Sequence, residues 1–373
     1  MIENPYIDTY RNTQTITRTF NALKTLSKNL TKPLKIMEVC GGHTHTIMKY
    51  ALPELLPDKI EFVHGPGCPV CVMPKNRIDC AYKIASQTDV ILVTLGDMIK
   101  VPGSYGSLQN ARAKGFDVRF VYSPLEVLKI AKENPTKRVV YFAIGFETTT
   151  PMSAALLERV VALRFHNISL HCNHVLVPPP LEAILSAPDC QISALLAPSH
   201  VSVITGSQIY RPLLEKFKIP IVVCGFEPVD VGESLLSIVQ QVLHQTPKVE
   251  TQYARSVTAQ GNLKAQELVQ RYFELDDNFY WRGLGEIPHS SLRLKKKFAN
   301  YDASILFKEH LDGIAKEEHK GCLCGEILRG NKKPFDCKLF GKFCNPQNPL
   351  GSCMVSSEGA CAAYYKYQGI RPA

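Results

Sequence analysis

Four cysteines near the C-terminus, Cys324, Cys337, Cys344 and Cys361, match in type and number the ligands of a metal centre. Twelve, six and sixteen residues separate them, and the connecting segments are rich in Gly, Pro, Asn and Lys. Such segments bury little apolar surface, so something other than packing must order them. The wide spacing favours a [4Fe–4S] cluster, whose thiolates can come from separate loops, over zinc, whose ligands usually arrive in close pairs.

Two further cysteines, Cys322 and Cys353, lie among these four. They could form a disulfide beside the cluster, which would serve as a redox relay between a one-electron centre and a two-electron thiol pair. They could equally be alternative ligands of the metal. The sequence leaves both possibilities open.

A second candidate site surrounds Cys40, which precedes two glycines and the histidines His43 and His45. The glycines allow the backbone to approach a ligand closely. A helix that begins near Thr44 would lower the pKa of the Cys40 thiol, and the histidines could hydrogen-bond a ligand or move protons. A thiolate beside imidazole suits a thiophilic metal ion, whereas the alternative is a buried cysteine at a strand end.

A third candidate site is the Cys-x-x-Cys sequence formed by Cys68 and Cys71 after Gly-Pro-Gly. In an α/β context this spacing indicates a redox or metal-binding pair, and it permits a disulfide within the motif. Half of a zinc site is the rival interpretation, but it would need two more ligands.

The elements that must position these residues follow from short apolar runs spaced by roughly 25 to 30 residues, the period of βαβ units. Their continuously apolar character is typical of buried parallel strands. The expected strands are 34–40, 60–64, 90–95, 118–122, 138–144, 168–172, 193–197 and 219–224. The expected helices are 8–30, 76–87, 124–133, 150–164, 181–185, 262–273 and 358–367.

This series predicts an α/β fold with two similar lobes, each a parallel sheet flanked by helices, and an irregular C-terminal iron–sulfur domain. An N-terminal helical segment covers 1–30, and lobe one covers 31–136 with the Cys40 and Cys-x-x-Cys motifs. Lobe two covers 137–245, and the C-terminal domain covers 246–373. Because ligands of parallel sheets bind at the carboxyl ends of the strands, we expect the chemistry there.

Composition narrows the function further. The 373 residues are 45% hydrophobic and 21% charged, and no apolar stretch approaches the roughly 20 residues of a membrane span. No secretory signal is visible, so we expect a cytoplasmic protein, whose thirteen cysteines indicate metal or redox-active thiols rather than a disulfide scaffold. The net charge of +9 comes without interleaved basic and aromatic residues, so we expect no nucleic-acid partner and no membrane partner.

Several unusual runs, in order along nearly the whole chain, resemble the HypD family of hydrogenase maturation factors. They are Met-Glu-Val-Cys-Gly-Gly-His-Thr-His at 37–45, His-Gly-Pro-Gly-Cys-Pro-Val-Cys at 64–71, Gly-Phe-Glu-Thr-Thr at 145–149, Trp-Arg-Gly-Leu-Gly at 281–285, Cys-Gly-Glu at 324–326, Cys-Asn-Pro-Gln at 344–347 and Val-Ser-Ser-Glu-Gly-Ala-Cys at 355–361.

The resemblance implies a scaffold that helps to assemble the Fe(CN)2CO moiety of [NiFe]-hydrogenases, with two α/β lobes and a [4Fe–4S] domain. It implies a HypC-type small chaperone and a HypE-type cyanide donor as partners, and the hydrogenase large subunit as an indirect one. By motif match, Cys40 would hold the iron together with a cysteine of the chaperone, and Cys68 and Cys71 would be the redox pair. Cys324, Cys337, Cys344 and Cys361 would hold the cluster.

Two other functions remain open at this point. A cluster-driven thiol–disulfide reductase acting on a protein partner would need Cys68 and Cys71 but has no clear need for Cys40, His43 and His45. A zinc-stapled binding module would need no redox chemistry. Whether the chain turns over as an enzyme is also open, because an assembly scaffold can use redox-active thiols without catalytic turnover.

Overall fold

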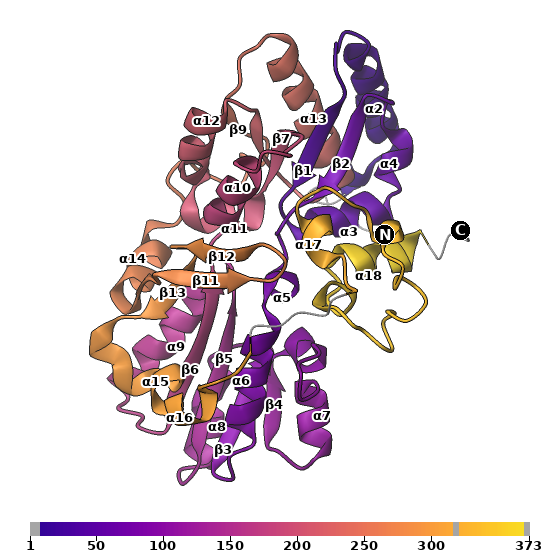
Figure 1. Cartoon of the computed structure of the whole chain (residues 1–373). Coiled ribbons are helices and arrows are strands. Elements are labelled where there is room, and N and C mark those ends of the chain that lie inside the picture. Colours follow the sequence, from indigo (N-terminus) through magenta and orange to yellow (C-terminus); the bar gives the residue numbers. More distant parts are fainter. Residues whose placement is uncertain (1–7, 316–320, 369–373) are drawn as a thin grey trace.

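A computed structural model describes residues 8–315 and 321–368, with two β-sheets placed one above the other and covered by helices (Figure 1). Residues 1–7, 316–320 and 369–373, which belong to the predicted segments 1–30 and 246–373, lie outside this description. Among the described helices, none combines the length and the apolar character that crossing a bilayer requires. Two sheets that are largely parallel and a cysteine-rich C-terminal region confirm the predicted α/β class.

The upper sheet in Figure 1 has the strand order β2-β1-β7-β8-β9, and all of its pairings are parallel. Its strands are β1 (Leu34–Glu38), β2 (Ile60–His64), β7 (Ile192–Pro198), β8 (Ile221–Cys224) and β9 (Val249–Thr251). Apolar side chains of α2 (Thr13–Ser27) and α13 (Pro228–Leu243) pack on one face of this sheet, where Phe20, Leu23 and Leu235 are buried.

The lower sheet has the order β10-β13-β6-β5-β3-β4, in which β10 and β13 are the antiparallel members. Its strands are β3 (Val90–Leu95), β4 (Val118–Val121), β5 (Arg138–Gly145), β6 (Ile168–Val175), β10 (Phe273–Leu275) and β13 (Ser291–Leu294). A separate hairpin joins β11 (Asn278–Trp281) to β12 (Gly285–Pro288).

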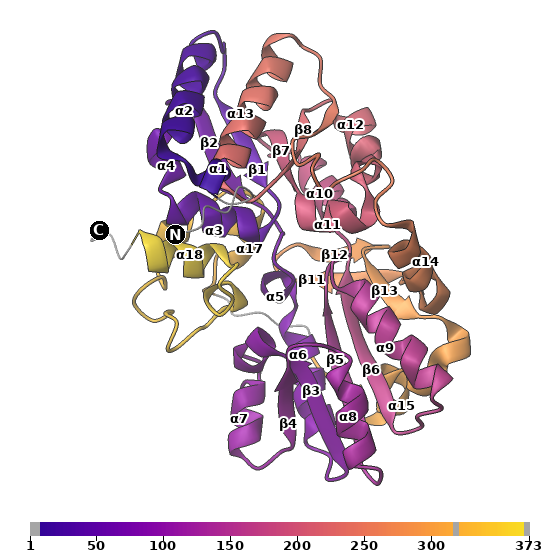
Figure 2. The same cartoon turned by 180° about the vertical axis from the view of Figure 1, so that it is seen from behind.

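The remaining helices cover the faces and ends of these sheets, as Figures 1 and 2 show from opposite sides. They are α1 (Asp8–Arg11), α3 (Gly41–Lys49), α4 (Leu52–Leu55), α5 (Pro69–Val72), α6 (Lys75–Ala85), α7 (Leu108–Ala113), α8 (Glu126–Glu133), α9 (Thr150–Ala162), α10 (Pro178–Leu185), α11 (Ser199–Thr205), α12 (Arg211–Phe217), α14 (Leu263–Tyr272), α15 (Ala303–Leu306), α16 (Lys308–Leu311), α17 (Cys324–Leu328) and α18 (Ala360–Tyr367).

The sheets draw on the chain differently from the predicted consecutive halves. Strands β3 and β4, assigned to lobe one, pair with each other, and β3 also pairs with β5 of lobe two. Strand β7, also assigned to lobe two, pairs with β1. The assignment of four consecutive strands to each lobe is therefore wrong, because the βαβ period shows where strands occur but carries no information about which strands pair.

Because each sheet contains strands from both halves of the chain, the loops that carry the candidate site residues lie close together. The chain crosses from the upper to the lower sheet through α5 and returns after β6, so the carboxyl ends of β1, β2, β5 and β7 approach the space between the sheets. The C-terminal region, with α17 and α18, lies beside α3 and the edge strand β2 (Figure 1). One apolar cluster contains residues of both sheets together with Cys68, Cys71, Cys324 and Cys353.

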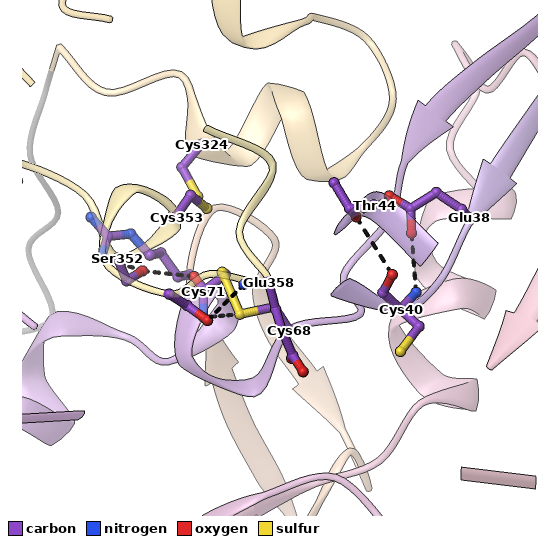
Figure 3. The surroundings of a disulfide bond; sticks show 11 residues. Glu38, Cys40, Thr44, Cys68, Cys71, Cys324, Ser352, Cys353 and Glu358 are labelled. Atoms are coloured by element: carbon purple, nitrogen blue, oxygen red, sulfur yellow. Dashed lines mark hydrogen bonds between the residues drawn. A yellow bond between two sulfur atoms is a disulfide. The ribbon is translucent and has the colours of Figure 1, made fainter. Parts of the chain in front are cut away.

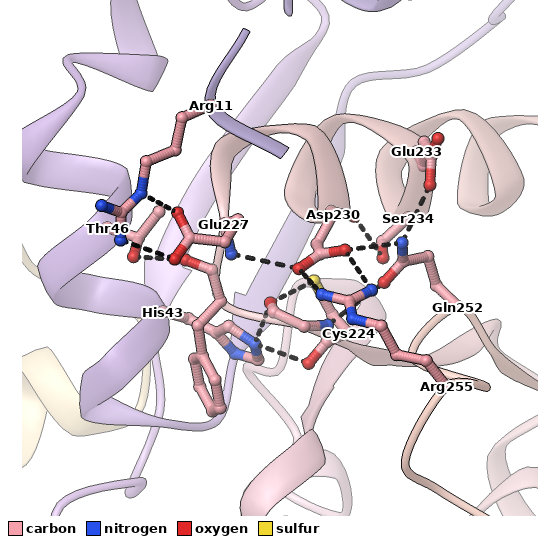
Figure 4. Close-up of polar contacts among 12 residues, drawn as sticks. Arg11, His43, Thr46, Cys224, Glu227, Asp230, Glu233, Ser234, Gln252 and Arg255 are labelled. Carbon is pink, nitrogen blue, oxygen red and sulfur yellow. Dashed lines mark hydrogen bonds and ion pairs between the residues drawn. The ribbon is translucent and has the colours of Figure 1, made fainter. Parts of the chain in front are cut away.

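A buried ion pair stabilises the start of α13. Asp230 is fully buried and accepts hydrogen bonds from both terminal nitrogens of Arg255, at 2.8 and 2.7 Å, and from Gln252 Nε2 at 2.9 Å (Figure 4). The same carboxylate accepts the backbone N–H of Glu227 at 3.2 Å, which caps the helix. Pro228 at the first helical position is preorganised for this start.

We expect Asp230→Ala to lower the free energy of unfolding by about 2–3 kcal/mol, because it removes the cap of α13 and leaves the partly exposed guanidinium of Arg255 without its hydrogen-bond partner. Denaturant unfolding followed by circular dichroism would measure the change. Glu182→Ala is the matched control, since its ion pair with Lys216 is exposed and should contribute at most about 1 kcal/mol. Equal losses from the two variants would contradict the structural role given to Asp230.

Candidate active site at the facing strand ends

Cys40 lies between β1 and α3, where its extended backbone begins the helix. Its side chain is buried, and its backbone N–H donates to Glu38 Oε2 at 3.2 Å. Gly67 is required beside it, because a Cβ at that position would collide with the backbone of Cys40. The strand end and the glycine-bearing loop after β2 together hold this thiol in place.

The pKa of the Cys40 thiol differs from the expected direction. Burial and the nearby carboxyl of Glu358 raise this pKa, whereas the backbone N–H groups of Gly42 and His43 act to lower it. The start of the helix therefore lowers the pKa of Cys40 as expected, but burial and Glu358 raise it by more. A desolvated thiolate is costly unless a cation or a metal compensates its charge.

A cavity of about 150 Å³ opens beside this thiol, and we call it the Cys40 cavity. Segments from both sheets and from the C-terminal region contribute to its walls. Its polar or closely approaching wall residues are Cys40, Gly67, Pro69, Thr148, Thr149, His200 and Glu358. The cavity thus lies at the carboxyl ends of β1, β5 and β7, where a parallel α/β fold places ligands.

His43 and His45 do not line this cavity. His43 is buried, and its Nε2 lies 3.0 Å from the carbonyl oxygen of Cys224 and 3.1 Å from that of Gly225 (Figure 4). Because these partners only accept, the ring donates from Nε2, and burial lowers its pKa. The ring therefore fixes the loop after β8 to α3.

His45 contacts the C-terminal helix instead. Its Nε2 lies 3.2 Å from the Tyr367 hydroxyl, and the two rings meet edge to face. Burial and the charges of Lys366 and Lys49 lower its pKa. The structure thus places both predicted histidines at contacts between elements, which leaves their roles toward a ligand as predictions.

His200 and Glu358 are the cavity residues that sequence reasoning missed. His200 follows β7, lines the Cys40 cavity and packs on Phe226 with ring centroids 4.1 Å apart. Glu358 comes from the C-terminal region, and burial followed by the charge of Asp97 raises its pKa. Its place in the run at 355–361, three residues before Cys361, was the available signal.

A buried hydrogen-bond network links Cys40 to the C-terminal helix. Glu38 accepts from the backbone of Cys40 and from the Thr44 hydroxyl, and its Oε1 lies 2.6 Å from His64 Nδ1. His64 Nε2 lies 3.1 Å from the Tyr364 hydroxyl of α18. With Nδ1 donating to the carboxylate, Nε2 can accept the tyrosine O–H, so each contact pairs a donor with an acceptor.

Cys68 and Cys71 form a disulfide in this structure, across the short helix α5 between the two sheets (Figure 3). Both are buried, and the intervening Pro69 lines the Cys40 cavity. On its other side, the carbonyl oxygen of Cys71 accepts from the Ser352 hydroxyl at 3.0 Å. The disulfide segment therefore lies between the cavity and the C-terminal cysteines.

All six C-terminal cysteines line one pocket, which we call the six-cysteine pocket. Leucine, isoleucine, phenylalanine and methionine side chains form most of the rest of its wall. No three His, Cys, Asp or Glu side chains among residues 8–315 and 321–368 already surround one metal-ion position, so the sulfur atoms share a pocket without a closed coordination shell. The pocket residues are Cys322, Cys324, Cys337, Cys344, Cys353 and Cys361, with Leu323, Ile327, Leu339, Phe340, Leu350, Gly351 and Met354.

The donor set of this pocket fits an iron–sulfur cluster, which cysteine thiolates hold in a largely apolar setting. Burial raises the pKa of Cys361, and the charges of neighbouring cysteines raise it further. Such crowded thiolates need positive charge, which a metal centre supplies. The suggested disulfide between Cys322 and Cys353 is absent: both are free, and Cys353 Sγ lies 2.7 Å from Cys324 Sγ.

We expect Glu358→Gln to increase the rate at which iodoacetamide alkylates Cys40 at pH 8. The carboxylate raises the pKa of the thiol, so removing its charge lowers that pKa and increases the thiolate fraction, about tenfold for each unit. Mass spectrometry of the Cys40 peptide measures the rate. Glu326→Gln, an acid of the same region outside the cavity, is the control, and equal rates in both variants would refute the assignment.

Comparisons with known proteins show the family of this chain. Residues 14–368 match the family model HypD, described as the hydrogenase formation hypA family. The hydrogenase maturation factor HypD of Azotobacter vinelandii is 48% identical over 99% of this chain and 98% of its own length. That of Escherichia coli K12 is 44% identical over 97% and 98%. HypD2 of Bradyrhizobium diazoefficiens is 48% identical over 91% of both chains. The chain therefore belongs to the HypD family of hydrogenase maturation factors.

Proposed function

We propose that this chain is a redox-active scaffold of [NiFe]-hydrogenase maturation, which holds the Fe(CN)2CO moiety on Cys40 during its assembly. One observation carries the proposal: a buried cysteine faces a cavity whose walls come from both sheets and from the C-terminal region. A HypC-type chaperone would share the iron through its own cysteine, and a HypE-type partner would supply cyanide. The hydrogenase large subunit would receive the completed moiety.

The chemistry of the cavity suits this cargo. Low-spin Fe(II) carrying cyanide and CO prefers soft, strong-field ligands, and a thiolate in a dry cavity is one. Loading requires the Cys40 thiol to lose its proton, and the charge of the iron offsets the desolvation that raises its pKa. Metal binding to Cys40 should therefore release a proton.

Polar groups around the cavity would orient the diatomic ligands. Sequence reasoning gave this task to His43 and His45, but His200, Thr148 and Thr149 line the cavity and are the better candidates for hydrogen bonds to cyanide nitrogen. Glu358, whose pKa burial raises, lines the same wall. Gly41 allows this approach, because a Cβ there would collide with Glu358.

The six-cysteine pocket would hold a [4Fe–4S] cluster through Cys324, Cys337, Cys344 and Cys361. When bound, the cluster supplies one-electron transfer. Cys322 and Cys353 line the same pocket, so they stay candidates for alternative ligands. The Cys68–Cys71 disulfide, in the segment between pocket and cavity, is the redox-active pair of the proposal.

A thiol–disulfide reductase is the second candidate, and the disulfide beside the six-cysteine pocket favours it. That function needs no thiol at position 40. Removal of the Cys40 thiol therefore distinguishes the two functions, because only the scaffold would lose its cargo.

We expect Cys40→Ala, co-expressed with the maturation partners and purified without oxygen, to lose the infrared bands of metal-bound CO and cyanide. The C-terminal iron and acid-labile sulfide should stay at parental levels, because the six-cysteine pocket is unchanged. Cys80→Ala, which removes another buried cysteine, is the control and should keep the bands. Parental bands in Cys40→Ala would contradict the scaffold, and unchanged disulfide-reductase activity without any bands in the parent would favour the second candidate.

Metal analysis of the anaerobically purified chain separates both functions from a zinc-stapled module. We expect iron and acid-labile sulfide in cluster proportion and almost no zinc. One equivalent of zinc without iron or sulfide would contradict both the redox-active scaffold and the cluster-driven reductase.

A further inference from the structure

The turn of the β11–β12 hairpin, residues 282–284, reaches the disulfide segment and the six-cysteine pocket at once. The backbone N–H of Arg282 donates to the carbonyl oxygen of Val72, the last residue of α5, at 2.9 Å. Gly283 packs so closely on Gly325, next to Cys324, that a Cβ at Gly283 would collide with its backbone. The turn thus bridges α5 and α17.

The hairpin gives this turn a rigid base. Trp281 is fully buried and its indole N–H donates to the Ser290 hydroxyl at 2.7 Å. Gly283 has a φ of +73°, a conformation that favours glycine, and its carbonyl oxygen accepts from Arg329 Nη2 at 3.1 Å. The position of the Arg282 side chain is therefore determined by the tertiary structure.

The guanidinium of Arg282 binds a serine that links the disulfide segment to the six-cysteine pocket. Arg282 is only 4% exposed, and its Nη1 donates to the Ser352 hydroxyl at 3.0 Å, which in turn donates to the carbonyl oxygen of Cys71 at 3.0 Å. Ser352 directly precedes Cys353. An ideal Cβ on Gly351 would lie 3.0 Å from Cys322 Sγ and 3.6 Å from Arg282 Nη2, so thiol and guanidinium flank the same glycine.

A buried positive charge in this place acts on both centres. Coulomb interactions are much stronger in a protein interior than in water, and an arginine stays protonated there. Reducing a cluster adds one negative charge, and reducing a disulfide at high pH yields two thiolates. Both reduced states are stabilised by a nearby cation.

We propose that Arg282 is a positioning residue that raises the reduction potentials of the Cys68–Cys71 disulfide and of the centre in the six-cysteine pocket. The part that concerns the cluster rests on the proposed function, whereas the part that concerns the disulfide does not. The disulfide takes up two electrons, breaks its S–S bond and gives two thiolates, or two thiols with two protons at lower pH. The cluster takes up one electron.

The primary test is a dithionite titration of the cluster in the anaerobic full chain, followed by electron paramagnetic resonance. We expect Arg282→Gln to make the cluster at least tenfold harder to reduce, which is about 59 mV for a one-electron couple. Arg282→Lys should restore most of the parental reduction potential, because lysine returns the positive charge although it lacks the planar guanidinium. Arg329→Gln, which removes the other arginine at this turn, is the control and should change the equilibrium less than threefold.

A second test needs no cluster. The metal-free full chain is equilibrated in dithiothreitol buffers between pH 7 and pH 10, and Cys68 and Cys71 are trapped and quantified by mass spectrometry. We expect the disulfide of Arg282→Gln to become harder to reduce than that of the parent, by at least tenfold at the highest pH. The difference should widen as pH rises, because the cation stabilises thiolates and not thiols. A purely structural role predicts no such pH dependence.

The outcomes are distinct. A parent without iron and sulfide refutes the proposed cluster but leaves the disulfide test to decide on Arg282. A parent and an Arg282→Gln variant with equal cluster potentials overturn the inference, as does a lysine variant that behaves like glutamine. If Arg282→Gln holds no cluster, a disulfide equilibrium that matches the parent at every pH overturns it instead.

Discussion

The buried carboxylate of Glu38 is the interaction on which the rest of the site depends. It joins the backbone of Cys40, the first turn of α3 and, through His64, the C-terminal helix at Tyr364. A buried carboxylate is costly unless each of its oxygens has a partner, and here both do. The docking of the C-terminal region and the position of the Cys40 thiol are therefore parts of one network.

The same coupling explains why the sulfur centres lie in the core and not on a loop surface. A single apolar cluster contains Cys68, Cys71, Cys324 and Cys353 and includes residues of both sheets. Interiors of this kind are close-packed, so the disulfide segment and the six-cysteine pocket cannot shift independently. Water exclusion strengthens electrostatic effects in this region, which is why single charges such as Glu358 and Arg282 matter there.

The cavity beside Cys40 is closed by the part of the chain that carries the six cysteines. Glu358 enters its wall from the C-terminal region, and His45 docks on Tyr367 of α18. A cargo held by Cys40 would thus be enclosed only while this region is docked. In the proposed scaffold, ordering of the tail by a cluster and formation of the cargo site support each other.

The sequence by itself determined the α/β class, the positions of most strands and the family, because apolar runs and motif residues are local properties. Only the tertiary structure decided which strands pair, since β3 could join either sheet by its pattern. Only the tertiary structure places His200 and Glu358 beside Cys40, and it places His43 against the carbonyl oxygen at the end of β8. His64 and Tyr364 are 300 residues apart, and such contacts depend on packing that no local pattern encodes.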